Sequence, residues 1–262
     1  MFSFLKLGGS LITNKASAET SRPDVIKRVA EEISQVLRDN PNIELLIGHG
    51  SGSFGHSVAR KYGTQAGVRS EEDWRGFSHV ATVAATLNHE ILTYLFEAGI
   101  PVFRIQPSAS AISNSGEIQE MAIAPIERAL ANKLVPLVYG DVAMDDSRGG
   151  TIISTETIFS YLATKLKPAQ ILLAGDYDGV WDAAGNIIPR ITPPTLADIS
   201  DTLGASEHPD VTGGMLTKTQ TMLDLCQKVD GLEALIFSGA QPGQIASALT
   251  GRNVAGTRIS AH

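Results

Sequence analysis

Cysteine is almost absent from this chain. Its 262 residues include one cysteine, Cys226, so no disulfide framework and no cysteine-based zinc spacing exists. Cys226 continues an apolar series with Met222 and Val229, which favours a small core residue over a nucleophile or a ligand. Any chemistry must therefore come from other side chains.

An excess of positive charge and long apolar runs are also missing. The chain has 28 acidic and 21 basic residues, a net charge of -7, and no basic run interleaved with aromatic residues. This composition gives little support to a nucleic-acid surface. No stretch approaches the length of a membrane span, and the opening "MFSFLKLGGS" reaches a lysine and a glycine pair too early for a signal peptide. We therefore expect a cytoplasmic protein with no nucleic-acid or membrane partner.

Short apolar runs alternate with helical periodicities along the chain. The runs, nearly all closed by Gly, Pro or Ser, cover residues 2–7, 43–47, 102–105, 134–138, 171–174 and 234–237. Such runs are typical of strands buried on both faces. Apolar residues recur at helical steps over 26–37 and 71–98, which predicts helices there. We expect an α/β fold, a mostly parallel sheet with helices on both faces, in a single domain over residues 1–262.

Two segments interrupt this alternation. Residues 108–120 and 141–154 contain Asn-Ser-Gly and Arg-Gly-Gly turns and therefore predict hairpins. The hairpins could form a flap over a site or lie at the edge of the fold, and turn chemistry does not separate these two possibilities.

Glycine-rich turns follow two of the predicted strands. Lys6 precedes the turn "GGS" at 8–10, where backbone N–H groups without Cβ interference can form a concave anion site. The stretch "LLIGHGSGSFGH" at 45–56 supplies four more glycines and ends in His56. Taken alone, the first turn could equally be an ordinary strand-to-loop turn that binds no anion, with Lys6 exposed to solvent at the end of the sheet. Ligands of parallel sheets, however, gather at the carboxyl ends of strands, and two such cradles suggest two phosphates.

Two later segments add charged residues at similar turns. The segment "DVTGGMLTK" places Gly213 and Gly214 at the predicted start of a helix whose first full turn carries Lys218. The segment "LLAGDYDGVW" closes a strand with Asp176, in an Asp-x-Asp-Gly sequence that is also ordinary turn chemistry. Taken together, the glycines, Lys6, Lys15, Lys218 and His56 suit phosphoryl transfer between two anions, which needs alignment and positive charge more than covalent help.

These segments resemble the amino-acid kinase superfamily, and within it the isopentenyl phosphate kinases most closely. Five motifs occur in the order and approximate spacing of that family, over essentially the whole chain. They are "LKLGGSLIT.K" at 5–15, "HGSGSFGH" at 49–56, "GDV" at 140–142, "D.DGV" at 176–180 and "DVTGGM..K" at 210–218.

The resemblance implies the three-layer αβα sandwich of that superfamily, usually as a homodimer. It also implies an enzyme that uses ATP and Mg²⁺ to phosphorylate isopentenyl phosphate to isopentenyl diphosphate, a precursor of isoprenoids. The expected mechanism is direct in-line transfer, without a covalent enzyme intermediate.

Residue roles follow from the same resemblance. Nucleotide binding is implied for Lys6, Gly8, Gly9, Ser10, Gly52, Asp176, Gly213, Gly214 and Lys218. Acceptor binding is implied for Ser51, Gly52, Gly55, His56 and Thr155. Catalysis is implied for Lys6, His56, Lys218 and Lys15, the last of which would stabilise the phosphoryl group in flight. No side chain is implied as a metal ligand. A protonated imidazole is favoured near a phosphate dianion, so His56 could donate a hydrogen bond and neutralise charge at once.

One stretch departs from the family pattern. Where these kinases typically carry Ser-Gly-Asp-Asp, this chain reads "STET" at 154–157. Thr155 replaces a glycine whose backbone would touch the acceptor phosphate, and that contact survives only if φ at Thr155 is ordinary rather than positive. Asp141 could orient Lys15 or a metal-bound phosphate, or it could cap a turn.

Other functions stay open from the sequence. A kinase of the same architecture for a phosphonate such as fosfomycin would share the glycine turn that ends in a histidine. The stripe Phe77, Val80 and Ala84 could wall an isoprenyl pocket or belong to the core. A nucleotide-binding protein without transfer activity is disfavoured by the retained lysines and His56, and mildly favoured by the altered 154–157 stretch.

Overall fold

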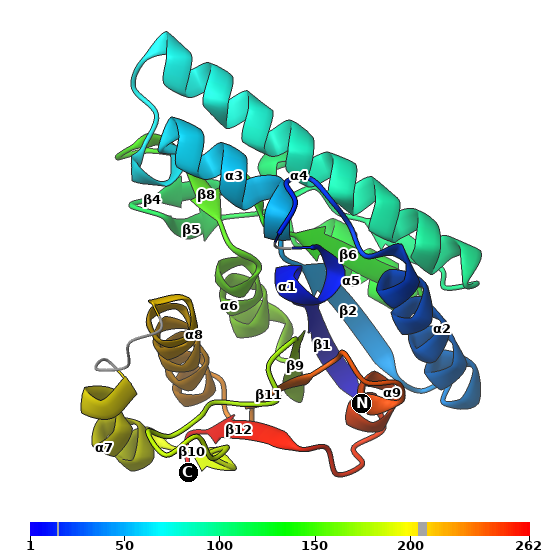
Figure 1. Ribbon diagram of the computed structural model, residues 1–262. Coiled ribbons are helices and arrows are strands. Elements are labelled where there is room, and N and C mark those ends of the chain that lie inside the picture. Colours follow the sequence, from blue (N-terminus) through cyan, green and yellow to red (C-terminus); the bar gives the residue numbers. More distant parts are fainter. Residues whose placement is uncertain (15, 204–208) are drawn as a thin grey trace.

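The computed structural model describes residues 1–14, 16–203 and 209–262, apart from the side chains of residues 56, 200–203 and 209–213. Figure 1 shows a central sheet with helices on both sides and a smaller sheet beside it.

The central sheet has eight strands in this described part of the chain. Their order is β10-β12-β11-β9-β1-β2-β6-β3. The strands are β1 (Phe2–Leu7), β2 (Glu44–His49), β3 (Val102–Arg104), β6 (Val135–Tyr139), β9 (Gln170–Gly175), β10 (Arg190–Ile191), β11 (Glu233–Ser238) and β12 (Gly256–Ser260). All neighbours pair in parallel except β11 and β12. The six strands predicted from apolar runs are confirmed, whereas the runs do not indicate β10 and β12.

Helices cover both faces of this sheet. The α-helices are α1 (Gly9–Ile12), α2 (Pro23–Asp39), α3 (Gly52–Tyr62), α4 (Glu71–Glu97), α5 (Ala124–Ala131), α6 (Thr155–Leu166), α7 (Pro193–Leu203), α8 (Pro209–Lys228) and α9 (Gln244–Leu249). The predicted helices begin at recognisable signals. Pro23 is the first residue of α2, and Ser70 and Asp73 form a reciprocal capping box at the start of α4.

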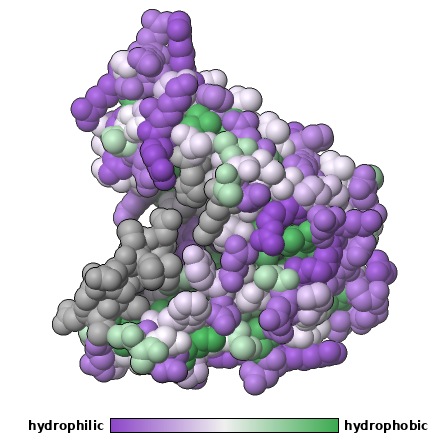
Figure 2. All heavy atoms as spheres, viewed as in Figure 1, coloured by the Kyte–Doolittle hydropathy of each residue, from purple (hydrophilic) through white to green (hydrophobic). Residues whose placement is uncertain are grey.

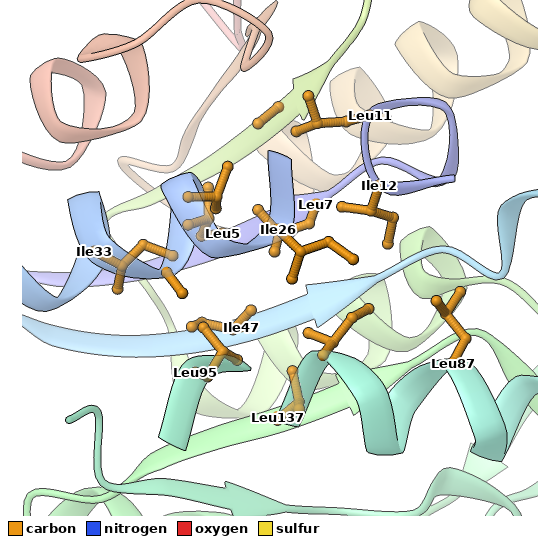
Figure 3. Packing of buried hydrophobic residues seen from close by; sticks show 14 of the residues in the cluster. Leu5, Leu7, Leu11, Ile12, Ile26, Ile33, Ile47, Leu87, Leu95 and Leu137 are labelled. Atoms are coloured by element: carbon orange, nitrogen blue, oxygen red, sulfur yellow. The ribbon is translucent and has the colours of Figure 1, made fainter. Parts of the chain in front are cut away.

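The sheet buries apolar side chains on both faces and so separates two cores. On one face, Leu5 and Ile47 pack with Ile26 of α2 and Leu87 of α4, as Figure 3 shows. On the other face, Phe4 belongs to a second core with residues of α6 and α8. The result is the expected three-layer αβα arrangement.

Alternation along β1 determines where its lysine lies. Successive side chains of a strand point to opposite faces, so Lys6 shares the face of Phe4 rather than that of Leu5 and Leu7. Lys6 is therefore turned toward α6 and α8, and it is 7% exposed.

Both predicted hairpins form and join in a second sheet. Its strands are β4 (Ile112–Asn114), β5 (Glu117–Glu120), β7 (Asp141–Asp145) and β8 (Gly149–Ile153), in the order β5-β4-β7-β8. Asp145 accepts hydrogen bonds from the amides of Ser115, Gly116 and Ser147, which ties the two turns together. This sheet packs on α4, where a Cβ on Gly150 would lie 2.7 Å from the ring of Phe77.

Among the described residues, every helix is too short or too polar to span a bilayer.

Candidate active site

Four central strands end at the same edge of the sheet. In the strand register, Leu7 lies opposite His49 and Ala174, and His49 lies opposite Tyr139. Each of these residues is followed by a glycine, namely Gly8, Gly50, Gly175 and Gly140. Seen from the same side as Figure 1, the surface is hollowed next to the part that contains α3 and the hairpins (Figure 2).

The first two glycine turns pack directly against each other. A Cβ on Gly9 would lie 2.6 Å from both Cα and N of Gly52, so the two backbones touch at a point where no side chain fits. Gly52 has φ of +49°, which glycine adopts without strain. Thr13 joins the turns further, because its hydroxyl donates to the carbonyl of Gly9 (2.6 Å) and accepts from the amide of Ser53 (3.0 Å). The two sequence motifs therefore form one structure.

This structure presents unpaired backbone donors. Among the hydrogen bonds of the described residues, the amides of Gly9, Ser10, Ser51 and Gly52 donate to no protein acceptor. Gly9, Ser10 and Gly52 belong to the first turns of α1 and α3, where no preceding helical carbonyl is available. Clustered free amides of this kind favour an anion.

Two lysines from distant parts of the chain meet at one carboxylate. Lys6 of β1 donates to Oε1 of Glu156 at 2.6 Å, and Nζ of Lys218 from α8 lies 3.7 Å from the same oxygen. Glu156 is the second residue of α6. The strand, α6 and α8 thus each contribute one charged group to this cluster.

The electrostatics of the cluster keep Glu156 ionised. Burial alone would raise the pKa of its carboxyl, but the charges of Lys6 and Lys218 and the hydrogen bond from Lys6 outweigh burial and lower the pKa to about 2. Two ammonium groups and one carboxylate leave a net positive charge next to the free amides. The cluster can therefore hold a further anion.

Asp176, at the end of β9, also engages a cation near the first glycine turn. Its Oδ1 lies 3.3 Å from Nη1 of Arg22, and Arg22 also donates to the carbonyl of Ser10 (3.3 Å). Arg22 thereby links the turn after β9 to the turn after β1.

The altered "STET" stretch forms the start of α6. Ser154 is the N-cap, and its hydroxyl accepts from the amide of Thr157 at 3.0 Å. Thr155 is the first helical residue, is not among the residues with positive φ, and donates from its hydroxyl to the carbonyl of His49 (2.6 Å). Its backbone conformation is therefore ordinary, and a contact from its amide does not require glycine.

A model of the amino acid kinase family matches residues 1–238 of this chain. The chain belongs to the amino acid kinase family. It is 36% identical to isopentenyl phosphate kinase of Methanothermobacter thermautotrophicus, over 98% of both chains. It is 34% identical to isopentenyl phosphate kinase of Methanocaldococcus jannaschii, over 99% of this chain and 98% of that one.

A solved structure of isopentenyl phosphate kinase has the same fold. Its TM-score with this chain is 0.84 at 32% identity, covering 99% of this chain and 100% of the other. The amino acid kinase fold expected from the sequence and the resemblance to isopentenyl phosphate kinases are therefore confirmed.

The structure brings together several of the residues that the kinase resemblance implies. Lys6 and Lys218 share Glu156, and the turn 8–10 touches Gly52. A Cβ on Gly55 would lie 2.6 Å from Cβ of Ser51, so this glycine lets the first turn of α3 close tightly. Lys15 and the side chain of His56 lie outside the described residues.

The expected start of the helix that carries Lys218 is wrong. The helix α8 begins at Pro209, so Gly213 and Gly214 lie inside it and Lys218 lies in its third turn. Proline fits the first turn of a helix because its missing N–H is not needed there, and the helix therefore starts one turn before the glycines. Lys218 therefore lies beside Glu156 and not at the positive end of the helix.

Two other residues or groups named from the sequence make structural contacts. The carboxylate of Asp141 is 1% exposed and accepts from the amides of Ser108 (3.1 Å) and Val142 (2.9 Å), so it caps a turn, and burial raises its pKa. The stripe Phe77, Val80 and Ala84 is buried and belongs to the core. An orienting role of Asp141 toward Lys15 stays a prediction.

Sequence reasoning missed the residues that link the lysines and the turns of this kinase site to one another. Glu156 stood out only as a departure from a pattern, and Thr13 and Arg22 were not singled out. Thr13 lies inside the first motif, so its position there was the only available signal. Nothing local in the sequence marks Arg22 or the meeting of Glu156 with two lysines.

Proposed function

We propose that this protein is an ATP-dependent kinase that converts isopentenyl phosphate to isopentenyl diphosphate. The observation that carries the proposal is the meeting of Lys6 and Lys218 at Glu156, beside two touching glycine turns with free amides. The acceptor is supported by relatives named isopentenyl phosphate kinase, which align over almost the whole chain.

The nucleotide side of the site is assigned to the first glycine turn and the lysine cluster. Gly8, Gly9 and Ser10 would cradle phosphate oxygens of ATP, and Lys6 and Lys218 would neutralise them. Asp176 and Gly213–Gly214 would border the same nucleotide. Phosphoryl transfer depends mainly on positioning and on charge stabilisation, so two ammonium groups held by one carboxylate suit a triphosphate.

The acceptor side is assigned to the second glycine turn. The free amides of Ser51 and Gly52, the close turn at Gly55 and the amide of Thr155 would hold the monophosphate, with His56 donating to one of its oxygens. Because Gly9 and Gly52 touch, the two phosphate groups would lie next to each other, as in-line transfer requires. Lys15 would stabilise the phosphoryl group as it passes between them.

Magnesium would be carried by the nucleotide. No group of three potential metal-ligating side chains occurs among the described residues, and the two acidic side chains at the site, Glu156 and Asp176, each already engage a cation. Mg²⁺ keeps several waters and binds readily to phosphate oxygens. When bound, it would further neutralise the charge of the triphosphate.

We also propose a cytoplasmic homodimer. The strand β3 lies at an edge of the central sheet, and its Phe103 is 43% exposed. Phe103 lines an open apolar groove of about 540 Å³ with Pro125 and Leu134. An exposed edge with an apolar rim is a typical site for pairing with another chain. Light scattering on the purified protein measures the oligomeric state directly.

The activity is tested with the purified protein, magnesium ATP and a panel of acceptors, with ADP release as the readout. Isopentenyl phosphate should give ADP and isopentenyl diphosphate. Turnover with fosfomycin but not with isopentenyl phosphate would show that the protein is a fosfomycin kinase. No ADP with any acceptor would favour a nucleotide-binding protein without transfer activity.

Replacement of His56 by Ala should weaken acceptor use and leave ATP affinity nearly intact.

A further inference from the structure

His49 is a buried histidine that none of the proposed substrate contacts uses. It ends β2, it is 1% exposed, and its ring stacks on that of Tyr139 with the centroids 5.6 Å apart. Its Nδ1 lies 3.1 Å from the carbonyl oxygen of Gly50, and its Nε2 lies 3.0 Å from Nδ2 of Asn88 in α4. The ring therefore connects the second glycine turn to the long helix.

These contacts define a single tautomer. The side-chain nitrogen of Asn88 can only donate, so Nε2 of His49 must accept, and Nδ1 then carries the proton that it donates to Gly50. If the side-chain amide of Asn88 were turned the other way, its oxygen would need a proton on Nε2 of His49. A neutral ring would then have no proton on Nδ1, and Nδ1 and the Gly50 carbonyl oxygen, both acceptors, would repel each other. Burial also lowers the pKa of His49 to about 4, which keeps the ring neutral.

The bond to Gly50 orients the donor that follows it. The Gly50 carbonyl and the Ser51 amide belong to one peptide unit, and no cis peptide bond occurs in the described chain. In a trans peptide these two groups point in opposite directions. Because the imidazole holds the oxygen in the interior, the N–H of Ser51 is turned away from the core and stays unpaired.

The backbone of the same residue reaches the other side of the site. The carbonyl of His49 accepts from the hydroxyl of Thr155 (2.6 Å) and from the amide of Gly140 (3.0 Å). Thr155 immediately precedes Glu156, which holds Lys6 and Lys218. His49 thus contacts the second glycine turn through its ring and the start of α6 through its carbonyl.

We propose that His49 is a positioning residue that orients the Ser51 amide toward the acceptor phosphate. This role rests on the proposed phosphoryl transfer to a monophosphate. His49 would act through the Gly50–Ser51 peptide and would not itself touch substrate, and Asn88 would select the tautomer that makes this possible.

The kinetic test compares three variants. His49→Phe keeps a ring against Tyr139 but removes both hydrogen bonds. His49→Asn keeps an N–H near the position of Nδ1 and can still donate to Gly50. His89→Phe makes the same change at an exposed histidine of α4 and serves as the control.

We expect His49→Phe to raise the KM for the acceptor about tenfold and to change the KM for ATP less than about twofold, the scale of one lost hydrogen bond. His49→Asn should recover most of the acceptor KM, and His89→Phe should match the wild-type protein. Equal increases of both KM values, or a fall in thermal stability with unchanged KM values, would overturn the positioning role.

A second measurement does not depend on turnover or on a variant that folds. Nitrogen NMR of histidine-labelled wild-type protein should show a neutral His49 ring with the proton on Nδ1 at pH 7. A proton on Nε2, or a cationic ring, would overturn the proposal even if the kinase is active. A protein without kinase activity but with this tautomer would instead contradict the proposed function alone.

Discussion

The carboxylate of Glu156 lies 2.6 Å from Nζ of Lys6, although 150 residues separate them in the sequence. The same carboxylate oxygen lies 3.7 Å from Nζ of Lys218. One acidic group from the start of α6 thus holds two ammonium groups from β1 and α8. Without it, the two like charges would repel each other and would lose their common position.

Replacement of Glu156 by Gln should reduce kcat by about 100-fold, because both lysines would lose the charge that we propose aligns them on the triphosphate. Glu156→Asp should be intermediate, since the carboxylate remains but is one methylene shorter. Steady-state kinetics with magnesium ATP and isopentenyl phosphate measure both effects. Glu127→Gln, the same change at an exposed position of α5, is the control. An unchanged kcat in Glu156→Gln would contradict the aligning role.

Two glycine-to-alanine changes separate steric closure from substrate contact. Gly9→Ala should abolish most activity and lower thermal stability, because its Cβ would lie 2.6 Å from the backbone of Gly52. Gly214→Ala meets open space inside α8 and should raise stability by about 0.5–1 kcal/mol through helix propensity. A raised KM for ATP in the stabilised Gly214→Ala protein would support its proposed place beside the phosphates. Wild-type behaviour of Gly9→Ala would refute the close contact of the two turns.

Replacement of Lys15 by Met should lower kcat much more than it weakens ATP binding. Its charge would matter most while the phosphoryl group is between donor and acceptor, and a contact made only in the transition state affects kcat and kcat/KM together. Equilibrium binding of ATP and steady-state kinetics, measured on the same preparation, separate the two quantities. Should ATP binding weaken while kcat stays constant, Lys15 would be a nucleotide-binding residue.

The stability of the protein should decrease as the pH falls from about 6.5 to about 4, in part because of His49. Its pKa is 6.5 in an unfolded chain and about 4 when folded, so the unfolded chain binds more protons in this range and unfolding becomes more favourable as acid is added. The shift corresponds to at most about 3 kcal/mol.

Urea denaturation of wild-type protein and His49→Asn at a series of pH values measures this contribution. The free energy of unfolding of the variant should depend less on pH between about 6.5 and 4, because its side chain does not titrate. If the free energy of unfolding changed equally with pH in the two proteins, His49 would not titrate as its burial requires.

Much of the fold could be predicted from local patterns. The runs 2–7 and 234–237 are apolar on both faces, so they had to be central strands, and the helical period over 71–98 matches α4 closely. The start of α8 could not be predicted in the same way. Gly213 and Gly214 resemble a helix-start signal, but their conformation is compatible with the interior of a helix that begins at Pro209.

The candidate site also contains features that the local sequence predicts and features that it does not. The glycine turns and their lysines are visible in the sequence because each needs only a few adjacent residues. Thr155 looked like the loss of a glycine, yet its ordinary φ and its hydroxyl bond to His49 make it part of the site's framework.

The sequence by itself determined six strands of the central sheet, two long helices and the glycine turns with their nearby lysines, because these depend on neighbouring residues. Only the tertiary structure decided that Glu156 joins Lys6 and Lys218, and that Gly9 touches Gly52. Such contacts link residues far apart in the chain. They arise only when the packed sheet brings its strand ends to one edge, and no local pattern records that geometry.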